Sequence, residues 1–326
     1  MRNRRKLLVA IGAGALAAPL ALFAQQPAKV YRIGFLGAAS ASGSAKWVEA
    51  FRAGLRDLGY LEGKNIAIEF RWAEGKYERL PELASDLVRL KIDVLVTHGV
   101  ATPAAKQATT TIPIVMANAA DAVALGFVAS LARPGGNITG STSFNPELSA
   151  KRLELLKEAL PRMTQVAALF NPDNPTTVLA LQAMEITAKT LKIKLQKFEA
   201  RGPNEFESVF AAMAKQRVDA FTVPVDAMFS ANARAIANLA AQKRLPSIGN
   251  DAFAETGGMI GYGVNAPELF RRAAYFVDKI LKGAKPGDIP VERPIRFELV
   301  INLKTAKAIG IKIPPTLVQR ADKVIE

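Results

Sequence analysis

Few side chains in this sequence could support covalent or metal chemistry. Among its 326 residues there is no cysteine, and His98 is the single histidine. A thiolate site and a His-rich metal site are therefore excluded, and a Ser-His-Asp triad would have to use His98. The sequence also contains no Gly-x-Ser-x-Gly elbow, Walker loop or metal-ligand spacing. We predict no catalytic residue, no metal and no cofactor, which leaves reversible binding as the chemistry to look for.

The residues best suited to binding follow predicted buried strands and could together hold a zwitterion. In the first half of the chain they are Ser40, Thr97, His98, Thr102, Asn118 and Asp121. In the second half they are Asn171, Asp226, Asn250 and Tyr262, with Asp251 beside Asn250. The Thr102 hydroxyl and the backbone amides after it suit a carboxylate, whereas Asp121 and Asp226 each suit an ammonium group. The sequence therefore predicts an amino acid or a similar small carboxylate as the ligand.

Tyr262 and Phe144 lie near the predicted hinge and favour an aromatic or apolar ligand side chain. Each candidate also has an ordinary structural explanation. Thr102 and the two aspartates can simply cap the helices that follow them. The two asparagines of the second half are typical turn residues. His98 can form hydrogen bonds to residues that themselves contact the ligand, and Tyr262 can simply mark a hinge. The sequence leaves these alternatives open.

The stretch from Ile92 to Ala105 shows how such side chains are positioned. Its first residues form an apolar run of strand length bounded by turn residues, which predicts a strand buried on both faces. Thr102 is then expected as the N-cap of a helix and Pro103 as its first residue. The free N–H groups of that first turn can bind a carboxylate or phosphate. In an open parallel sheet, ligands bind at this edge.

The same order of strands and helices occurs twice along the chain. Strands are predicted at 30–37, 65–72, 93–99, 112–118 and 137–143, then at 166–171, 192–200, 219–226 and 245–251. Strands that alternate with helices indicate parallel sheets, and the near-constant offset indicates two similar units. We therefore predict an α/β fold with two Rossmann-like lobes joined by a hinge; two unrelated α/β halves are the alternative.

The last 60 or so residues are too few for a third domain. They read as a helix at 269–281, a strand at 296–303 and a final helix, and we expect them to cross between the lobes. The predicted N-terminal lobe is 28–142 plus 262–290, and the predicted C-terminal lobe is 143–261 plus 291–326.

Residues 1–24 have the plan of a secretory signal peptide, with a basic start, an apolar stretch and small residues near Ala24. The Arg4-Arg5 pair resembles a twin-arginine signal, and an uncleaved anchor is the alternative. The net charge is +14, but the basic residues are dispersed and form no stripe or known motif, so nucleic-acid binding is not expected. We predict an exported, periplasmic protein that is a monomer.

Four strings carry a resemblance to a known family. They are Ala-Thr-Pro-Ala-Ala at 101–105, Ile-Pro-Ile-Val at 112–115, Arg-Pro-Gly-Gly-Asn-Ile-Thr-Gly at 133–140 and Phe-Glu-Leu-Val-Ile-Asn-Leu-Lys-Thr-Ala at 297–306. With them the chain resembles periplasmic binding proteins of type I topology, and more closely the ABC transporter substrate-binding proteins that include tryptophan- and tyrosine-binding members. The resemblance implies a cleft that closes on a small ligand and an ABC permease in the inner membrane as partner.

Two other functions stay open at this point. One is an exported α/β enzyme, for which a single histidine and no cysteine leave little acid–base chemistry. The other is a ligand-sensing domain that acts through a separate protein. An adjacent permease and ATPase gene would favour transport over sensing, and a turnover assay would test for an enzyme.

Overall fold

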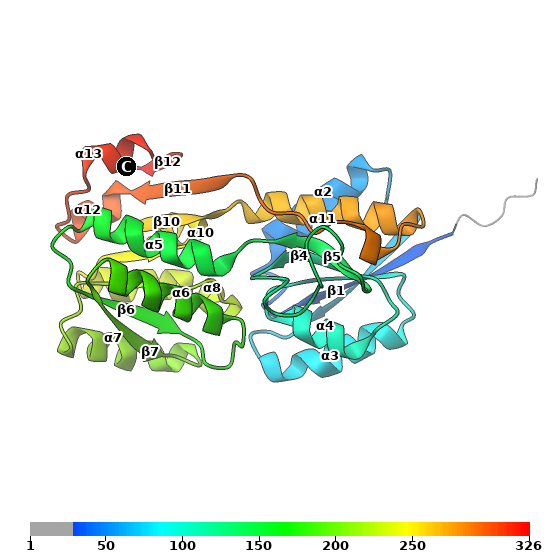
Figure 1. Cartoon of the computed structure of the whole chain (residues 1–326), viewed down its shortest axis with the longest axis horizontal. Coiled ribbons are helices and arrows are strands. Elements are labelled where there is room, and N and C mark those ends of the chain that lie inside the picture. Colours follow the sequence, from blue (N-terminus) through cyan, green and yellow to red (C-terminus); the bar gives the residue numbers. More distant parts are fainter. Residues whose placement is uncertain (1–28) are drawn as a thin grey trace, which may run out of the picture.

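The computed structural model describes residues 29–326, so the predicted leader, residues 1–24, lies outside the described part of the chain. Two α/β lobes lie side by side along the long axis of the molecule, each built on its own sheet (Figure 1). This arrangement confirms the predicted fold class.

The sheet of the first lobe has five parallel strands in the order β2-β1-β3-β4-β5. Its strands are β1 (Tyr31–Gly37), β2 (Ile66–Trp72), β3 (Val94–His98), β4 (Ile114–Ala119) and β5 (Ile138–Thr142). Val94, Leu95 and Val96 are completely buried, as the apolar run predicts for a strand covered on both faces. Gly140 lies so close to β4 that a Cβ there would sit 2.1 Å from the Met116 carbonyl oxygen. Only glycine fits this position.

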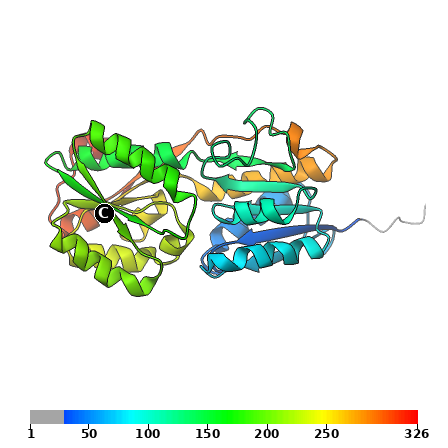
Figure 2. The ribbon, with the colours of Figure 1, turned by 60° about the horizontal axis from the view of Figure 1, so that its bottom comes forward.

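Two pairs of helices cover the first sheet, one pair on each face (Figure 2). The first pair is α2 (Ala45–Asp57) and α11 (Ala266–Leu281), which share an apolar cluster with β1, β3 and β4. The second pair is α3 (Leu80–Arg89) and α4 (Ala101–Ala108), whose buried leucines and alanines form the cluster on the opposite face. The first lobe therefore takes one of its four main helices from the last quarter of the chain.

The sheet of the second lobe has seven strands in the order β12-β11-β10-β9-β8-β6-β7. They are β6 (Gln165–Phe170), β7 (Lys194–Glu199), β8 (Ala220–Thr222), β9 (Ser247–Gly249), β10 (Ile260–Val264), β11 (Phe297–Asn302) and β12 (Lys323–Ile325). Strand β11 runs antiparallel to β10, whereas the other neighbouring strands of this sheet pair in parallel. Strand β10 leads out of the second lobe toward α11, whereas β11 leads back into it from the first lobe, which accounts for their opposite directions.

Helices again cover both faces of the second sheet. One face carries α5 (Asn145–Ala159) and α6 (Thr177–Thr190), and the other carries α7 (Phe206–Lys215), α8 (Ala227–Ala231) and α9 (Ala233–Gln242). Short helices complete the lobes: η1 (Tyr77–Arg79), η2 (Pro203–Glu205), α10 (Asp251–Glu255), η3 (Pro286–Asp288), α12 (Leu303–Ala308) and α13 (Pro315–Gln319).

Within residues 29–326 the chain passes between the lobes at three places. These are the link from β5 to α5, Asn265 between β10 and α11, and the segment from Glu292 to β11. The first and third links lie side by side, because the Thr142 N–H donates to the Glu292 carbonyl at 2.9 Å. The whole of β10 belongs to the second sheet, so the second crossing is at 265, whereas the prediction placed it after 261.

Candidate functional site

A small cavity lies between the two lobes at the carboxyl ends of the strands, where the fold predicts a ligand. We call it the inner cavity; its volume is about 70 Å³. The first lobe lines it with Trp47, His98 and Asn118, and the second with Asn174, Thr176 and Asp226. Ser143 and Asn145 line it from the first crossing. It therefore brings together three of the predicted binding residues: His98, Asn118 and Asp226.

A second, larger space opens outward from the same region. This outer chamber has a volume of about 710 Å³ and shares Val100 with the inner cavity. Tyr77, Pro103 and Gln107 line it from the first lobe, and Asn171 and Arg201 from the second. The two spaces together form one cleft between the lobes, narrow inside and wide at its mouth.

Several buried polar atoms at the cleft and the adjoining crossing have no hydrogen-bond partner within residues 29–326. They are Ser44 Oγ, Thr97 Oγ1, His98 Nε2, Thr102 Oγ1, Asn118 Oδ1, Asn145 Oδ1, Ser149 Oγ and Arg152 Nη1. Buried polar atoms in folded proteins are nearly always paired, so an unpaired group requires an explanation. Three of these atoms belong to residues that line the inner cavity: His98, Asn118 and Asn145. A bound ligand would supply the missing partners.

The His98 imidazole lies in an aromatic environment. Its ring centroid is 5.4 Å from that of Trp47 and 5.2 Å from that of Phe270, both in edge-on contact. Trp47 and Phe270 are stacked on each other at 5.4 Å. Burial among these rings lowers the pKa of His98 to about 4, because the charged imidazolium loses its hydration. The side chain is therefore neutral at physiological pH and can accept or donate one hydrogen bond through Nε2.

The prediction that Thr102 is the N-cap of its helix is wrong. Helix α4 begins at Ala101 and Val100 is its N-cap, so Thr102 is the second helical residue. The helix starts early because Gly99 adopts a left-handed backbone (φ 52°) that turns the chain, and the Thr102 N–H donates to the Gly99 carbonyl at 3.1 Å. Thr102 and Thr97 are both completely buried and do not line the inner cavity.

Four other candidates accept hydrogen bonds from nearby backbone N–H groups of their own loop or helix. Asp121 Oδ1 accepts from the Val123 and Ala124 N–H groups, and Asn171 Oδ1 accepts from the Asp173 N–H. Asn250 caps α10 through the Phe253 N–H, and Ser40 Oγ accepts from the Gly43 N–H. Asn171 lines the outer chamber, whereas Ser40, Asp121 and Asn250 line neither space.

Asp226 lies at the centre of a hydrogen-bond network that links the lobes. It is 2% exposed and caps α8, with Oδ1 accepting from the Met228 N–H at 2.8 Å and the Phe229 N–H at 3.1 Å. Its Oδ2 accepts from Asn174 Nδ2 at 2.8 Å. Burial raises the pKa of Asp226, while these hydrogen bonds oppose the shift. The carboxylate is thus already well supplied with donors from the protein.

Tyr77 carries this network across the cleft. Its hydroxyl belongs to the first lobe and accepts from the Met228 N–H of the second lobe at 3.1 Å. Burial, and then the charge of Asp226, raise the pKa of Tyr77, so the hydroxyl stays protonated and can also donate to that carboxylate. The two lobes are therefore held in contact at the boundary between the inner cavity and the outer chamber.

Tyr77→Phe is expected to shift the lobes toward a more open arrangement and to weaken ligand binding by roughly threefold to tenfold. The reason is that closure loses an inter-lobe hydrogen bond that contributes about 1 kcal/mol. Small-angle scattering should give a larger radius of gyration, and calorimetry a higher Kd. Tyr31→Phe is the matched control, because its hydroxyl bonds within the first lobe to the Leu281 carbonyl at 3.5 Å. Equal effects of the two substitutions would contradict a role for Tyr77 in closure.

Tyr262 does not line the inner cavity. It stacks on Phe297 with ring centroids 6.1 Å apart, and its carbonyl accepts from Arg152 Nε at 2.7 Å. Sequence reasoning missed Trp47, Asn145, Asn174 and Thr176, which do line the cavity. Trp47 belongs to an apolar series at helical spacing, which is typical of a helix core, whereas Asn174 follows a strand end in the turn Pro-Asp-Asn-Pro, and that turn is the available signal.

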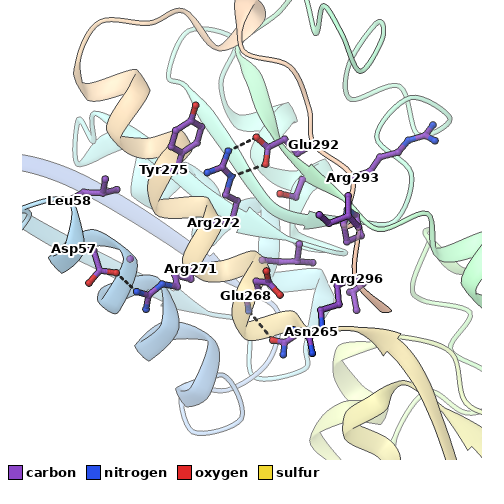
Figure 3. A pocket seen from close by; sticks show the side chains of 16 residues that line it. Asp57, Leu58, Asn265, Glu268, Arg271, Arg272, Tyr275, Glu292, Arg293 and Arg296 are labelled. Atoms are coloured by element: carbon purple, nitrogen blue, oxygen red, sulfur yellow. Dashed lines mark hydrogen bonds and ion pairs between the residues drawn. The ribbon is translucent and has the colours of Figure 1, made fainter. Parts of the chain in front are cut away.

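A third space lies at the hinge, outside the cleft (Figure 3). This hinge groove has a volume of about 700 Å³ and runs between α2, α11 and the segment 292–296. Much of its charge is paired internally: Arg272 donates twice to Glu292, and Arg271 pairs with Asp57. None of its lining residues has a buried side-chain atom that lacks a partner. Although it is larger than the inner cavity, it shows fewer signs of a ligand.

Within residues 29–326, no group of three or more His, Cys, Asp or Glu side chains could hold a metal ion. No helix in this range is long and apolar enough to cross a membrane.

Comparison with known proteins identifies relatives of this fold and cleft. Residues 33–325 match the family described as "ABC transporter substrate binding protein". A tyrosine-binding protein of Clostridioides difficile is 27% identical over 269 residues, which is 81% of this chain and 76% of that protein. The structure of an ABC domain from Streptococcus pneumoniae in complex with L-Trp is 26% identical, with a TM-score of 0.84 over 91% of this chain and 100% of that one.

A ligand-free, open structure of a substrate-binding protein with adhesive properties from Clostridium difficile matches less well. It has 24% identity and a TM-score of 0.66 over 91% of this chain and 99% of that one. This similarity shows the same fold.

Proposed function

The chain belongs to the ABC transporter substrate binding protein family, and from this membership we propose that it captures an amino acid between its lobes for an importer. Members of this family bind substrates and are not enzymes. The observation that supports the proposal best is the set of buried, unpartnered polar atoms of His98, Asn118 and Asn145 at the inner cavity. These groups would pair with the polar end of a ligand that both lobes enclose.

An aromatic side chain suits the apolar part of the cleft. Trp47 and the neutral His98 ring line the inner cavity with Phe270 packed against both, and the ring of a ligand can pack on the two that face the cavity. Two relatives at 26–27% identity, one a tyrosine-binding protein and one solved with L-Trp, support the same ligand class. We propose tyrosine, tryptophan or a similar amino acid as the ligand.

The proposed setting is the periplasm, with an ABC permease in the inner membrane as the partner and the protein acting as a monomer. The basic and apolar plan of residues 1–24 supports export through a cleaved signal peptide, of either the general or the twin-arginine type. A ligand-sensing role is the second candidate function, and an adjacent permease and ATPase gene would argue against it.

Titration calorimetry of the purified protein against the common amino acids is expected to give micromolar or tighter binding for at least one aromatic member. Saturating ligand should also raise the unfolding temperature, because it binds the native state only. Mass spectrometry of ligand retained through purification would identify the natural solute independently. If no amino acid binds and a different solute is retained, the proposed ligand class is wrong.

A further inference from the structure

Two asparagines line the inner cavity from segments that are joined to each other by hydrogen bonds. Asn118 is the penultimate residue of β4, and Asn145 is the first residue of α5. The Asn145 N–H donates to the Ala120 carbonyl at 2.9 Å, and the Ser143 N–H donates to the Ala119 carbonyl at 2.8 Å. These bonds fix the start of α5 against the end of β4. The backbone positions of these two residues, whose side chains we call the amide pair, are therefore fixed relative to each other.

Both members of the amide pair have a buried Oδ1 without a hydrogen-bond partner within residues 29–326. Asn145 is only 5% exposed, so open solvent does not supply the missing donor. A buried acceptor left unpaired costs about 1–3 kcal/mol, and proteins rarely keep two at one cavity unless a ligand satisfies them. The two oxygens therefore call for a ligand group with several N–H donors.

The acidic residue at the cavity already uses most of its acceptor sites. Both carboxylate oxygens of Asp226 already accept hydrogen bonds, from the Met228 and Phe229 N–H groups and from Asn174 Nδ2. His98 cannot oppose a cation, because burial lowers its pKa to about 4 and keeps its ring neutral. An ammonium group at this cavity would meet neutral acceptors and no competing positive charge among the described lining residues.

We propose that the amide pair, Asn118 and Asn145, recognises the primary ammonium group of the ligand through the two Oδ1 atoms. This inference rests on the proposed function and assigns its amine specificity to residues other than Asp226. An ammonium donates three hydrogen bonds, so both amide oxygens can accept from it at once.

The test measures by calorimetry the affinity of the full mature chain for two probes, L-phenylalanine and 3-phenylpropanoate, which differ only by the amine. The wild type should prefer the amine-bearing probe by about tenfold or more, since hydrogen bonds to charged groups are the stronger kind. Asn118→Ala and Asn145→Ala should each weaken L-phenylalanine about tenfold to hundredfold. They should leave 3-phenylpropanoate within about twofold, which a general loss of structure would not do.

Asn118→Asp and Asn145→Asp keep the shape and the acceptor and add a negative charge. They should retain L-phenylalanine binding and further weaken 3-phenylpropanoate. Asn204→Ala, at an exposed asparagine of η2, is the surface control and should change neither affinity.

Four results would count against the amide pair. Equal losses for both probes in the alanine variants, or no preference for the amine in the wild type, would overturn it while the proposed function stands. A further probe is a tryptophan or tyrosine analogue that keeps the amine and lacks the carboxylate. If this analogue binds and the alanine substitutions do not change its affinity, the pair contacts the carboxylate end of the ligand. Failure of the wild type to bind any amino acid would overturn the proposed function together with this inference.

Discussion

Asp226→Ala is expected to weaken ligand binding at least ~10-fold and also to lower the free energy of unfolding by about 2–4 kcal/mol. The carboxylate caps α8 through two N–H groups and holds Asn174 Nδ2, so its removal leaves the Phe229 N–H and Asn174 Nδ2 without their acceptor and the Met228 N–H with the Tyr77 hydroxyl alone. It also removes the group that faces the Tyr77 hydroxyl from across the cleft. Affinity should fall because the closed arrangement loses its network rather than because an ammonium loses its counter-ion.

Asp226→Asn separates these two explanations. The amide oxygen can still cap α8, so most of the stability should remain, and affinity should fall much less than in the alanine variant. Calorimetry gives the affinities and urea titration gives the free energies of unfolding. If the asparagine variant loses amino-acid binding as completely as the alanine variant yet stays fully stable, the charge itself contacts the ligand and the network explanation is wrong.

Arg152→Ala is expected to lower the free energy of unfolding by about 3 kcal/mol. The Arg152 side chain is 1% exposed, and its Nε donates to the Tyr262 carbonyl at 2.7 Å, which ties the crossing helix α5 to the crossing strand β10. Truncation would leave a cavity and an unpaired carbonyl next to the hinge. It would also remove the one positive charge that lowers the pKa of the nearby Asp251. Thermal and urea unfolding should both show the loss.

The pH dependence of stability identifies the electrostatic part of the Arg152→Ala effect. Burial raises the pKa of Asp251 from 3.8 to about 6, so the folded state binds a proton that the unfolded state releases. The charged carboxylate therefore destabilises the fold above about pH 6, and this destabilisation disappears as the pH falls toward about 4. Asp251→Asn should raise stability near neutral pH by about 2 kcal/mol, should change it little near pH 4, and should offset part of the Arg152→Ala loss. If Asp251→Asn changes the stability equally near pH 4 and near neutral pH, the raised pKa of Asp251 is contradicted.

The fold was predictable from the sequence because hydrophobic period and turn residues act locally. The run that ends at His98 is an apolar strand between turn residues, and β3 is buried as that pattern requires. The rule that ligands lie beyond the carboxyl ends of parallel strands then selected His98, Asn118 and Asp226, which line the inner cavity. Strand position is enough for such residues, since the end of a parallel strand fixes which edge of the sheet they occupy.

The remaining site residues depend on geometry that no local pattern contains. Asn145 lines the cavity because the crossing from β5 turns back against β4, and the sequence does not show that return. Arg152 is buried although it belongs to a helix with polar positions all along it, so its pattern resembles that of an exposed arginine. Thr102 was misassigned because the left-handed turn at Gly99 lets α4 begin before the threonine.

The passage of α11 back to the first lobe also has a consequence for the order in which the protein can be made. Phe270, Phe276 and Val277 of α11 complete the apolar cluster with α2, β1 and β3, yet the last strand of that lobe ends at residue 142. A ribosome must therefore add the whole central part of the second lobe before the first lobe can bury its own core. During synthesis the core of the first lobe therefore stays incomplete until residues 266–281 have been added, late in translation.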